Sequence, residues 1–477
     1  MTRHAVVIGS GPNGLVAAIE LAKAGFEVEV REAAEEPGGG VRSAELTLPG
    51  FVHDVCSAIH PLAVASPALR ELDVEWVHPD APAAHPLDDG TAVVLERSLD
   101  ETAGSLGADA GAYRTLVESI LDAWNDFAGL RFLRAFRRVG PAALRTSLGA
   151  ATQLAERRFR NERTRALFAG HAAHSMLPLE RRPSAGFGVA LLAMGHAVGW
   201  PFPKGGAGRL AEALVVRLRD LRGEVLTSAP ADELPWADLV LADVAPRELL
   251  RIAAGRLPPR YARSLARYRH GPGAFKVDWA LREPIPWTAP EAGRAGTVHL
   301  GGSLDEIAAS ECAAWEQRPA ERPFVLLAQQ GRFDPTRGQT AWAYCHVPNG
   351  SSEDMTERIE AQVERFAPGF RDLILARNAM APAALEARNR NLVGGDLNNG
   401  AMDLPQLLFR PAARPVPWRT PVEGLYLCSA ATPPGGGVHG LCGYFAAKTA
   451  LRDLERREGV IRVHATRPRG RGLARGG

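Results

Sequence analysis

Residues 4–32 read HAVVIGSGPNGLVAAIELAKAGFEVEVRE, and this stretch decides the fold of the N-terminal region. Residues 5–8 are all apolar, as in a parallel strand that is buried on both faces. Apolar residues then recur at helical spacing until Gly25, and residues 26–30 alternate between apolar and acidic side chains as a second strand. The order of strand, glycine-rich turn, helix and strand predicts the first unit of a Rossmann-like domain.

The glycine-rich turn between the first strand and the helix has the spacing that a dinucleotide needs. We expect Gly9 to allow the tight turn, Gly11 to let the backbone approach a pyrophosphate, and Gly14 to let the helix pack on the strand. The phosphates would lie over the free N–H groups of the helix N-terminus. The predicted phosphate site consists of Gly9, Gly11, Pro12, Asn13 and Gly14.

Glu32 ends the second strand, 18 residues after Gly14. A carboxylate at this position can accept hydrogen bonds from both hydroxyls of an adenosine ribose. The strand, the turn and this carboxylate together predict dinucleotide binding. The alternative is a glycine turn in an unrelated α/β unit.

A second glycine-rich segment, AAEEPGGGVRS at residues 33–43, favours FAD over NAD. It resembles the double-glycine motif of the flavin amine oxidase and phytoene desaturase superfamily, which brings backbone to the far side of the pyrophosphate. Members often have arginine after the two glycines. Here Gly40 stands at that position, so N–H groups or Arg42 must meet the phosphate charge. An ordinary glycine-rich loop is the alternative. The predicted cofactor site also includes Gly38, Gly39, Arg42 and Ser43.

A third glycine-rich turn lies in GLYLCSAATPPGGGVHG, at residues 424–440. It predicts a buried strand, a turn, and a helix over about residues 438–456 whose first N–H groups have no internal partner. Such a helix end would stabilise negative charge on the N1–C2=O edge of a reduced isoalloxazine. A turn of an ordinary α/β unit is the alternative. The residues predicted to contact the flavin here are Gly436, Gly437, Val438 and His439.

Other segments extend the resemblance over most of the chain. They are similar to the phytoene desaturase-like branch, which includes carotenoid desaturases and isomerases, and most of all to the pyridine nucleotide-disulfide oxidoreductase domain-containing proteins. This resemblance implies an oxidoreductase with bound FAD, and it leaves the substrate open. The segments are PGFVHD at 49–54, FPKGG at 202–206, GAFKVD at 273–278, GGD at 394–396 and LFRP at 408–411.

The chain departs from this family between two predicted strands, at 223–227 and 238–242. Relatives usually place a β-hairpin there, whereas only residues 228–236 intervene in this sequence. We therefore expect the backbone cover over the adenine to be shortened, with an effect on FAD affinity.

The predicted fold class is α/β, with a Rossmann-like FAD-binding domain and an interleaved α+β substrate domain made of a mixed sheet plus helices. Further strands are expected at 274–281, 324–329 and 340–347, and mostly helices over about 100–200. The predicted FAD-binding domain comprises residues 1–100, 204–260 and 412–462, the substrate domain comprises 101–203 and 261–411, and 463–477 form a basic disordered tail.

Composition excludes several classes of protein. The formal net charge is +2, so no global field attracts nucleic acid. None of the five cysteines forms a C-x-x-C pair, no metal-ligand spacing occurs, and no apolar run reaches the length of a membrane span. The first strand begins too early for a signal peptide, so we expect a cytoplasmic protein. Residues 124–168 carry ten arginines against three acids, which indicates a solvated helical surface, or a basic face for an anionic membrane surface or an acidic partner.

Three residues are candidate catalytic groups. His60 and His439 fall in segments expected near the flavin, where a histidine either transfers protons or only holds the loop. Lys276 is one of only four lysines among 56 basic residues, and it shares a strand face with Asp278. Its segment resembles the amine oxidase strand whose lysine holds a water against flavin N5. A solvated lysine at a sheet edge is the alternative.

These observations predict an FAD-dependent oxidoreductase, in which hydride passes from a small, largely apolar substrate to flavin N5 and the FAD is bound non-covalently. The electron acceptor is open between oxygen, a quinone and a nicotinamide. An amine oxidase-like activity or a redox-neutral isomerisation is the alternative among enzymes. The alternative outside enzymes is a flavin-binding regulatory or interaction protein.

Overall fold

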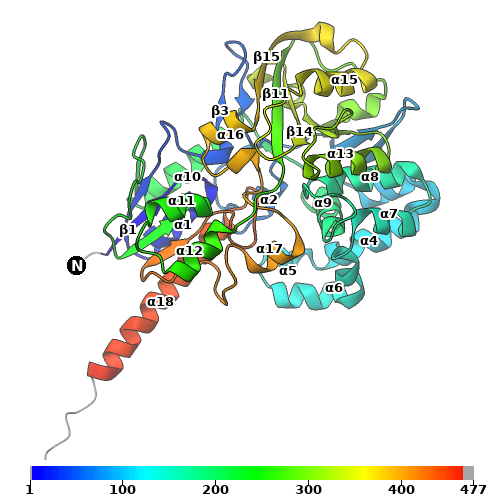
Figure 1. The fold of residues 1–477 in the computed structure, drawn as a ribbon. Coiled ribbons are helices and arrows are strands. Elements are labelled where there is room, and N and C mark those ends of the chain that lie inside the picture. Colours follow the sequence, from blue (N-terminus) through cyan, green and yellow to red (C-terminus); the bar gives the residue numbers. More distant parts are fainter. Residues whose placement is uncertain (1–2, 466–477) are drawn as a thin grey trace, which may run out of the picture.

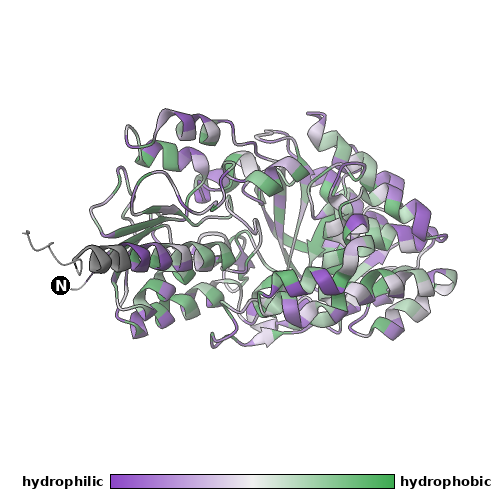
Figure 2. Cartoon of the chain, turned by 90° about the horizontal axis from the view of Figure 1, so that it is seen from below, coloured by the Kyte–Doolittle hydropathy of each residue, from purple (hydrophilic) through white to green (hydrophobic). Residues whose placement is uncertain are grey.

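The structure, a computed structural model, describes residues 3–465, with side chains described up to residue 457. Two sheets form its centre, and helices pack around each of them (Figure 1). Seen from below, the molecule is elongated, with the smaller parallel sheet in one half and the larger sheet in the other (Figure 2). The predicted α/β fold class, with a Rossmann-like domain and a mixed-sheet domain, is confirmed.

The smaller sheet has five strands, all parallel. Each of them was predicted from the sequence to within two residues. In spatial order they are β16 (Leu425–Leu427), β10 (Leu239–Ala242), β1 (His4–Ile8), β2 (Glu27–Arg31) and β9 (Glu224–Leu226).

Continuous apolar strands are needed here because successive side chains enter two different cores. In β10, Leu239 and Leu241 pack with one group of helices, and Val240 and Ala242 pack with another. The first group is α1 (Pro12–Lys23), α10 (Gly208–Asp220) and α18 (Leu441–Ala465), and the second is α11 (Pro246–Ile252) and α12 (Pro259–Ala266).

The larger sheet has seven strands and is mixed. Its pairs are antiparallel except for β6 and β12, which run parallel. In spatial order the strands are β15 (Ile374–Met380), β11 (Gly273–Leu281), β14 (Thr340–Val347), β13 (Val325–Ala328), β12 (Ala295–Leu300), β6 (Ala81–Pro86) and β7 (Ala92–Leu95).

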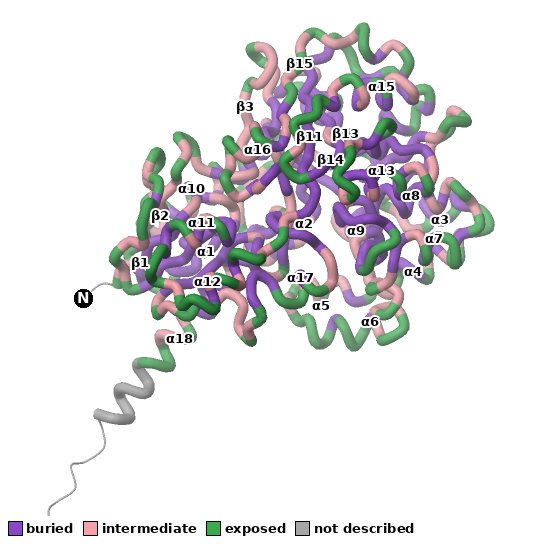
Figure 3. Tube along the Cα trace, viewed as in Figure 1, coloured by how far each residue is buried: buried purple, intermediate pink, exposed green. Residues whose placement is uncertain are grey.

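One face of the larger sheet packs against α15 (Thr356–Phe366), and a helical layer lies on the other side. Buried segments fill the interior of the molecule, and most exposed segments lie at its periphery (Figure 3). The helices expected over about 100–200 are confirmed. They are α3 (Leu99–Ser105), α4 (Ala110–Asp122), α5 (Trp124–Ala128), α6 (Phe132–Ser147), α7 (Ala151–Arg158), α8 (Glu162–Ala173) and α9 (Ser184–Ala197).

The remaining elements are short. Two small antiparallel ribbons pair β3 (Ser43–Ala44) with β4 (His53–Asp54), and β5 (Trp76–Val77) with β8 (Phe202–Pro203). No helix within residues 3–465 is long and apolar enough to cross a membrane. The other helices are α2 (Pro61–Ala65), α13 (Leu304–Trp315), α14 (Gln330–Phe333), α16 (Pro382–Arg388) and α17 (Leu404–Phe409).

The structure places some segments differently from the predicted domain division. Residues 81–95 were assigned with 1–100 to the FAD-binding domain, but β6 and β7 belong to the larger sheet because β6 pairs with β12. Conversely, α12 packs on the parallel sheet although it lies mostly beyond the predicted boundary at residue 260. The predicted tail begins inside α18, which runs to residue 465, and the rest of it lies outside the described residues.

Candidate cofactor and substrate site

One cavity of about 560 Å³ is lined by residues of both sheets. Nine of the fourteen predicted cofactor residues line it, as does His60. The nine are Gly9, Gly11, Pro12, Asn13, Glu32, Gly39, Arg42, Gly437 and Val438.

The turn between β1 and α1 leaves open backbone at the helix N-terminus. Gly14 does not line the cavity, and a Cβ there would clash with the carbonyl of Gly9, as expected for close packing of helix on strand. Asn13 lines the cavity, and its buried Oδ1 has no hydrogen-bond partner. Helix α18 covers α1 so closely that a Cβ on Gly443 would clash with the carbonyl of Asn13.

Asp243 is a site residue that we did not predict. It follows β10 directly. It lies beside the glycine turn after β1 because the carboxyl ends of parallel strands meet at one edge of a sheet. Its Oδ2 accepts the N–H of Gly14 at 2.9 Å and lies 2.7 Å from the position of a Cβ on Gly11. Burial raises the pKa of Asp243 to about 7, the Gly14 hydrogen bond opposes this rise, and the nearby Glu32 carboxylate adds to it.

Glu32 lies at the predicted ribose position, but much of its carboxylate is already bonded. Oε2 accepts the backbone N–H of Ser10 at 2.8 Å and its hydroxyl at 2.6 Å, and Oε1 accepts the N–H of Ala34 at 2.9 Å. A carboxylate has about four lone-pair sites. In this arrangement Glu32 therefore has room for one ribose hydroxyl, where two were predicted.

Residues 227–238, between β9 and β10, contain no strand, and the effect of this short connection on FAD affinity stays a prediction. Pro230 and Ala231 of this loop line the cavity together with side chains of α11. Arg251 of α11 donates to the Ala231 carbonyl at 3.0 Å, so the helix holds the loop in place. Loop and helix together form this wall of the cavity.

The double-glycine segment divides between packing and cavity lining. Gly38 packs against α10, where its Cβ would lie 2.8 Å from that of Ala211. Ser43 lies outside the cavity, where its hydroxyl donates to Asp54 and accepts the N–H of Gly208. Arg42 lines the cavity, and its guanidinium donates to the carbonyls of Gly39 at 3.1 Å and Arg388 at 2.5 Å.

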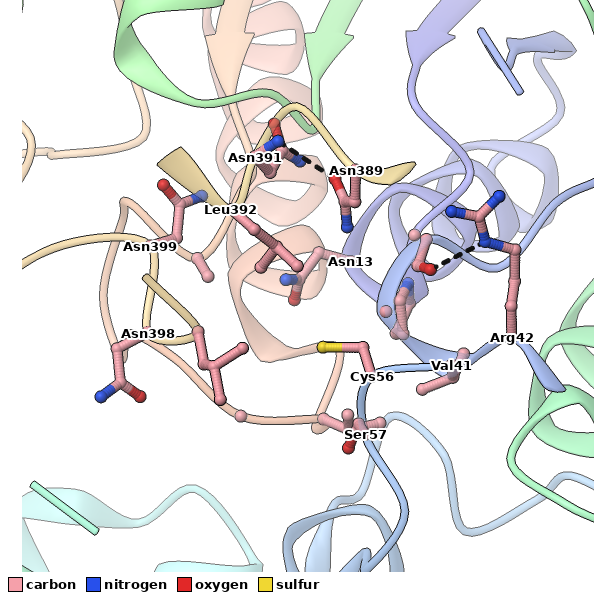
Figure 4. A pocket seen from close by; sticks show the side chains of 18 of the residues that line it. Asn13, Val41, Arg42, Cys56, Ser57, Asn389, Asn391, Leu392, Asn398 and Asn399 are labelled. Atoms are coloured by element: carbon pink, nitrogen blue, oxygen red, sulfur yellow. Dashed lines mark hydrogen bonds between the residues drawn. The ribbon is translucent and has the colours of Figure 1, made fainter. Parts of the chain in front are cut away.

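An asparagine-rich loop from the predicted substrate domain completes this part of the cavity, and we did not predict it (Figure 4). Asn391 ties the loop to the end of β10, because its side chain donates to the Asp243 carbonyl at 2.9 Å and accepts the Ala245 N–H at 2.7 Å. The sequence signal was the run RNRNLVGGDLNNG at 388–400. The asparagines of this loop that line the cavity are Asn389, Asn391, Asn398 and Asn399.

The C-terminal glycine turn lies at the other end of this loop. Gly437 and Val438 line the cavity, whereas Gly436 packs so that its Cβ would lie 2.8 Å from Asn398 Oδ1. His439 does not line the cavity. Its Nδ1 accepts the Leu441 N–H at 3.0 Å, and its Nε2 lies 3.2 Å from the Gly435 carbonyl. With both nitrogens bonded to backbone, His439 holds the turn, and burial lowers its pKa to about 4.

His60 lines the cavity at the start of α2. Its Nε2 lies 3.1 Å from the Ser57 hydroxyl, and its buried Nδ1 has no partner. Burial lowers the pKa of His60 to about 4. The ring is therefore neutral at pH 7, and its proton-transfer role stays a prediction.

The larger sheet forms the floor of the cavity. Directly paired residues of neighbouring strands point to the same face, so one row runs across the sheet through Lys276, Tyr344, Leu326 and His299. A second row runs through Asp278, Trp342, Ala328 and Thr297. The middle of the floor is apolar and aromatic, with the rings of Trp342 and Tyr344 stacked at 5.4 Å.

Lys276 lies at one edge of this floor, on the same face as Asp278, as predicted. It is 3% exposed and forms an ion pair with Asp278, so it is not a solvated edge residue. Its ammonium lies 5.4 Å from the ring centre of Trp342, which lines the cavity, whereas Lys276 itself does not. Its role near the flavin stays a prediction.

The residues present fit FAD. The three glycine turns leave backbone N–H groups and a helix N-terminus open at one end, with Glu32 beyond them. The orphaned Asn13 Oδ1 needs a donor, which a bound ligand or water supplies. The unbroken passage from these turns to the apolar floor fits a cofactor whose ring system reaches the substrate.

Comparisons with known proteins agree with this geometry. Residues 7–73 match the model of the NAD(P)-binding Rossmann-like domain. A mouse protein, pyridine nucleotide-disulfide oxidoreductase domain-containing protein 2, is 26% identical over 94% of each chain. One of the limonene dehydrogenase polypeptides of Castellaniella defragrans is 33% identical over 26% of this chain and 21% of its own. Among solved structures, a triple mutant of putrescine oxidase is similar with a TM-score of 0.59, at 16% identity over 95% of this chain and 99% of the other.

Proposed function

The chain has a flavin amine oxidase-like fold, and from this premise we propose that it is an FAD-dependent oxidoreductase acting on a largely apolar substrate. The observation that carries the proposal is the continuous cavity that joins the dinucleotide turns to the apolar floor of the larger sheet. Bound FAD supplies a two-electron acceptor for a hydride. The protein holds the cofactor, orients the substrate against it and excludes water.

An apolar substrate is favoured over an amine by the charges around the cavity. The described carboxylates that line it are Glu32, Asp243 and Glu248, all at the dinucleotide end. The described substrate end therefore offers no carboxylate to bind an ammonium. The similarity to a limonene dehydrogenase polypeptide is consistent with an apolar substrate, over the part of the chain that it matches.

The test has two steps. Purified protein is denatured and the released cofactor is identified, with intact FAD expected in the supernatant. The FAD-loaded protein is then mixed without oxygen with an apolar lipid extract and, separately, with polyamines. Bleaching of the flavin by the lipid fraction alone supports the proposal, bleaching by polyamines alone supports an amine oxidase, and reoxidation by oxygen, a quinone or NAD identifies the acceptor. FAD that no reductant of this kind bleaches indicates a flavin-binding regulatory protein.

We further propose that α6 and its surroundings bind an anionic lipid surface, the reservoir of such a substrate. Six of the nine exposed large apolar side chains in the described part of the chain lie in α6, just after it, or in α17. Arg137 and Arg145 are exposed on the same helix, whereas the other arginines of its first half pair with Asp126. The six are Phe132, Leu133, Phe136, Leu148, Leu408 and Phe409.

Apolar side chains flanked by arginine suit the boundary between headgroups and acyl chains. The protein is expected to co-sediment with vesicles of phosphatidylglycerol and phosphatidylcholine, and not with phosphatidylcholine alone. The double variant Leu133→Ser, Phe136→Ser should lose this binding, whereas Trp236→Ser, which removes a 97% exposed side chain elsewhere, should keep it. Equal binding by both variants overturns the proposal.

A further inference from the structure

Three histidines, which we call the histidine cluster, lie at the substrate end of the cavity: His171, His174 and His299. His174 follows the last turn of α8 and lines the cavity, and His299 lies on β12 behind it. The ring centres of His174 and His299 are 5.1 Å apart, and those of His171 and His299 are 4.9 Å apart. Trp200, which also lines the cavity, packs edge-on against all three rings.

The hydrogen bonds within the cluster leave imidazole nitrogens free. His174 Nε2 and His299 Nε2 are 3.0 Å apart, so the two nitrogens share one hydrogen. His171 Nδ1 lies 2.7 Å from the Leu167 carbonyl and must donate to it, which leaves His171 Nε2 as an acceptor. His171 Nε2 and His299 Nδ1 are both buried and have no partner among the described residues.

The unpaired nitrogens of the histidine cluster lower the stability of the folded protein. A buried polar group without a partner costs about 1–3 kcal/mol, and apolar side chains would fill the same space without that cost. No group of three or more His, Cys, Asp or Glu side chains in the described part of the chain is arranged to hold a metal ion. Two unpaired imidazole nitrogens beside a cavity therefore call for a function, and a neutral imidazole nitrogen can accept a proton.

Other titratable groups surround the cluster. His85 on β6 lies 2.7 Å from the Gly302 carbonyl through its Nε2, and His196 on α9 bonds to the Tyr113 hydroxyl at 2.7 Å. His346 lies on the cavity face of β14, and its Nδ1 is 2.8 Å from the Glu311 carboxylate on α13. Burial lowers the pKa of each cluster member and other histidines, within and around the cluster, lower it further, although the bond to the Leu167 carbonyl opposes this shift in His171. All three are neutral acceptors at pH 7.

We propose that His174 is a catalytic base that takes a proton from the substrate, and that the histidine cluster holds this proton while the cofactor is reduced. The inference rests on the proposed oxidoreductase function. A hydride leaves one substrate carbon for the oxidised FAD. The C–H bond of the adjacent carbon breaks, its electron pair forms a C=C bond, and the proton passes to the free nitrogen of His174. The substrate loses two hydrogens, FAD gains two electrons and one hydrogen, and the histidine cluster gains one proton.

The hydrogen bond to His299 orients the ring of His174 and determines which of its nitrogens can accept a proton. When His174 Nε2 donates to His299, His174 Nδ1 is free to accept the proton. The resulting imidazolium lies at the C-terminal end of α8, where the helix dipole favours positive charge. His299 and His171 are positioning residues: they orient His174 and offer nitrogens to the added proton.

The test needs no substrate, because reduction by dithionite leaves the same negative charge on the bound flavin as hydride transfer does. Full-length FAD-loaded protein labelled with 15N-histidine is studied by NMR at pH 7, before and after reduction. One imidazole should change from the neutral to the cationic 15N pattern on reduction, and this signal should be absent in His174→Gln. His196→Gln, which removes a buried histidine that does not line the cavity, should retain the change.

The midpoint potential of the bound FAD gives a second readout. One extra proton taken up on two-electron reduction changes the equilibrium tenfold per pH unit, or about 30 mV. The potential should therefore fall about 30 mV per pH unit more steeply in the native protein than in His174→Gln or His299→Gln.

The possible failures are distinguishable. Protein that carries no flavin overturns the proposed function together with this inference. Flavin-loaded native protein in which the cluster imidazoles all stay neutral after reduction overturns this inference alone, and that measurement on the native protein does not depend on whether any variant folds.

Discussion

Asp243 provides a test of the electrostatics at the phosphate turn. Its carboxyl lies at the N-terminus of α1, bonded to the Gly14 N–H, and burial raises its pKa to about 7. The substitution Asp243→Asn keeps an oxygen that accepts the Gly14 N–H, and it removes the ionisation. The variant therefore separates the cost of a buried charge from the hydrogen bond.

The expected effect on stability follows from proton linkage. An aspartate in the unfolded chain has a pKa of about 3.9. Between pH 5 and pH 7 the native protein keeps a proton on Asp243 that the unfolded chain has lost, so its free energy of unfolding falls as pH rises. The loss is about 1.4 kcal/mol per pH unit, or roughly 3 kcal/mol over this interval, and little more follows above the native pKa.

Urea unfolding of the cofactor-free protein at pH 5 and pH 8 measures this effect. Relative to the native sequence, Asp243→Asn should gain about 3 kcal/mol of stability between the two pH values. Asp238→Asn, which removes an exposed carboxylate just before the same strand, is the control and should gain little. A gain no larger than that of the control would show that Asp243 is ionised in the native protein at pH 5.

Further predictions concern the cofactor. Gly11→Val should abolish FAD binding while the protein stays folded by circular dichroism, because the side chain fills the approach to the pyrophosphate. The control Gly111→Ala, which has open space around its Cβ, should retain FAD. Normal flavin content in Gly11→Val would contradict the assignment. Glu32→Gln should weaken FAD binding about tenfold or more in a fluorescence titration, since it weakens the charge-assisted hydrogen bond from the ribose hydroxyl. Unchanged affinity would show that Glu32 does not bind the ribose. The double variant Lys276→Met, Asp278→Asn removes both members of the buried ion pair and should still bind FAD. Reoxidation of its reduced flavin, measured by stopped flow, should be about tenfold slower, which is a barrier change of about 1.4 kcal/mol. An unchanged rate would assign the pair a structural role alone.

The parallel sheet could be predicted closely because β1, β10 and β16 are mostly apolar runs, β2 alternates clearly, and glycine turns mark several strand ends. Parts of the larger sheet could not. Strand β6 reads APAAHP, and alanine and proline have low strand propensity, so its pairing with β12 and β7 makes it a strand. Strand β15 lies at the sheet edge with alternately exposed side chains, and its ILARNAM sequence has little apolar pattern.

The same limit applies to the site. The glycine turns act through local backbone geometry, and spacing along the chain reveals them. The contributions of Asp243 and Asn391 depend on contacts between distant segments, since Asp243 lies 229 residues from Gly14 and 148 residues from Asn391, and local pattern does not encode such contacts. The histidine cluster likewise brings together α8 and β12, and neither sequence segment by itself indicates a shared site.

The close cover of α18 on α1 has a consequence for how the protein is made. Strand β1 is translated more than 400 residues before β16 and α18, which complete the same domain. At about 5–20 residues per second, synthesis of the intervening chain takes roughly 20–80 s. Until β16 and α18 are translated, one edge of β10 lacks its partner strand, and the face of α1 against which Gly443 packs lacks its cover. The dinucleotide turn is thus translated long before the helix that covers it, so the apolar face of α1 stays uncovered until α18 emerges.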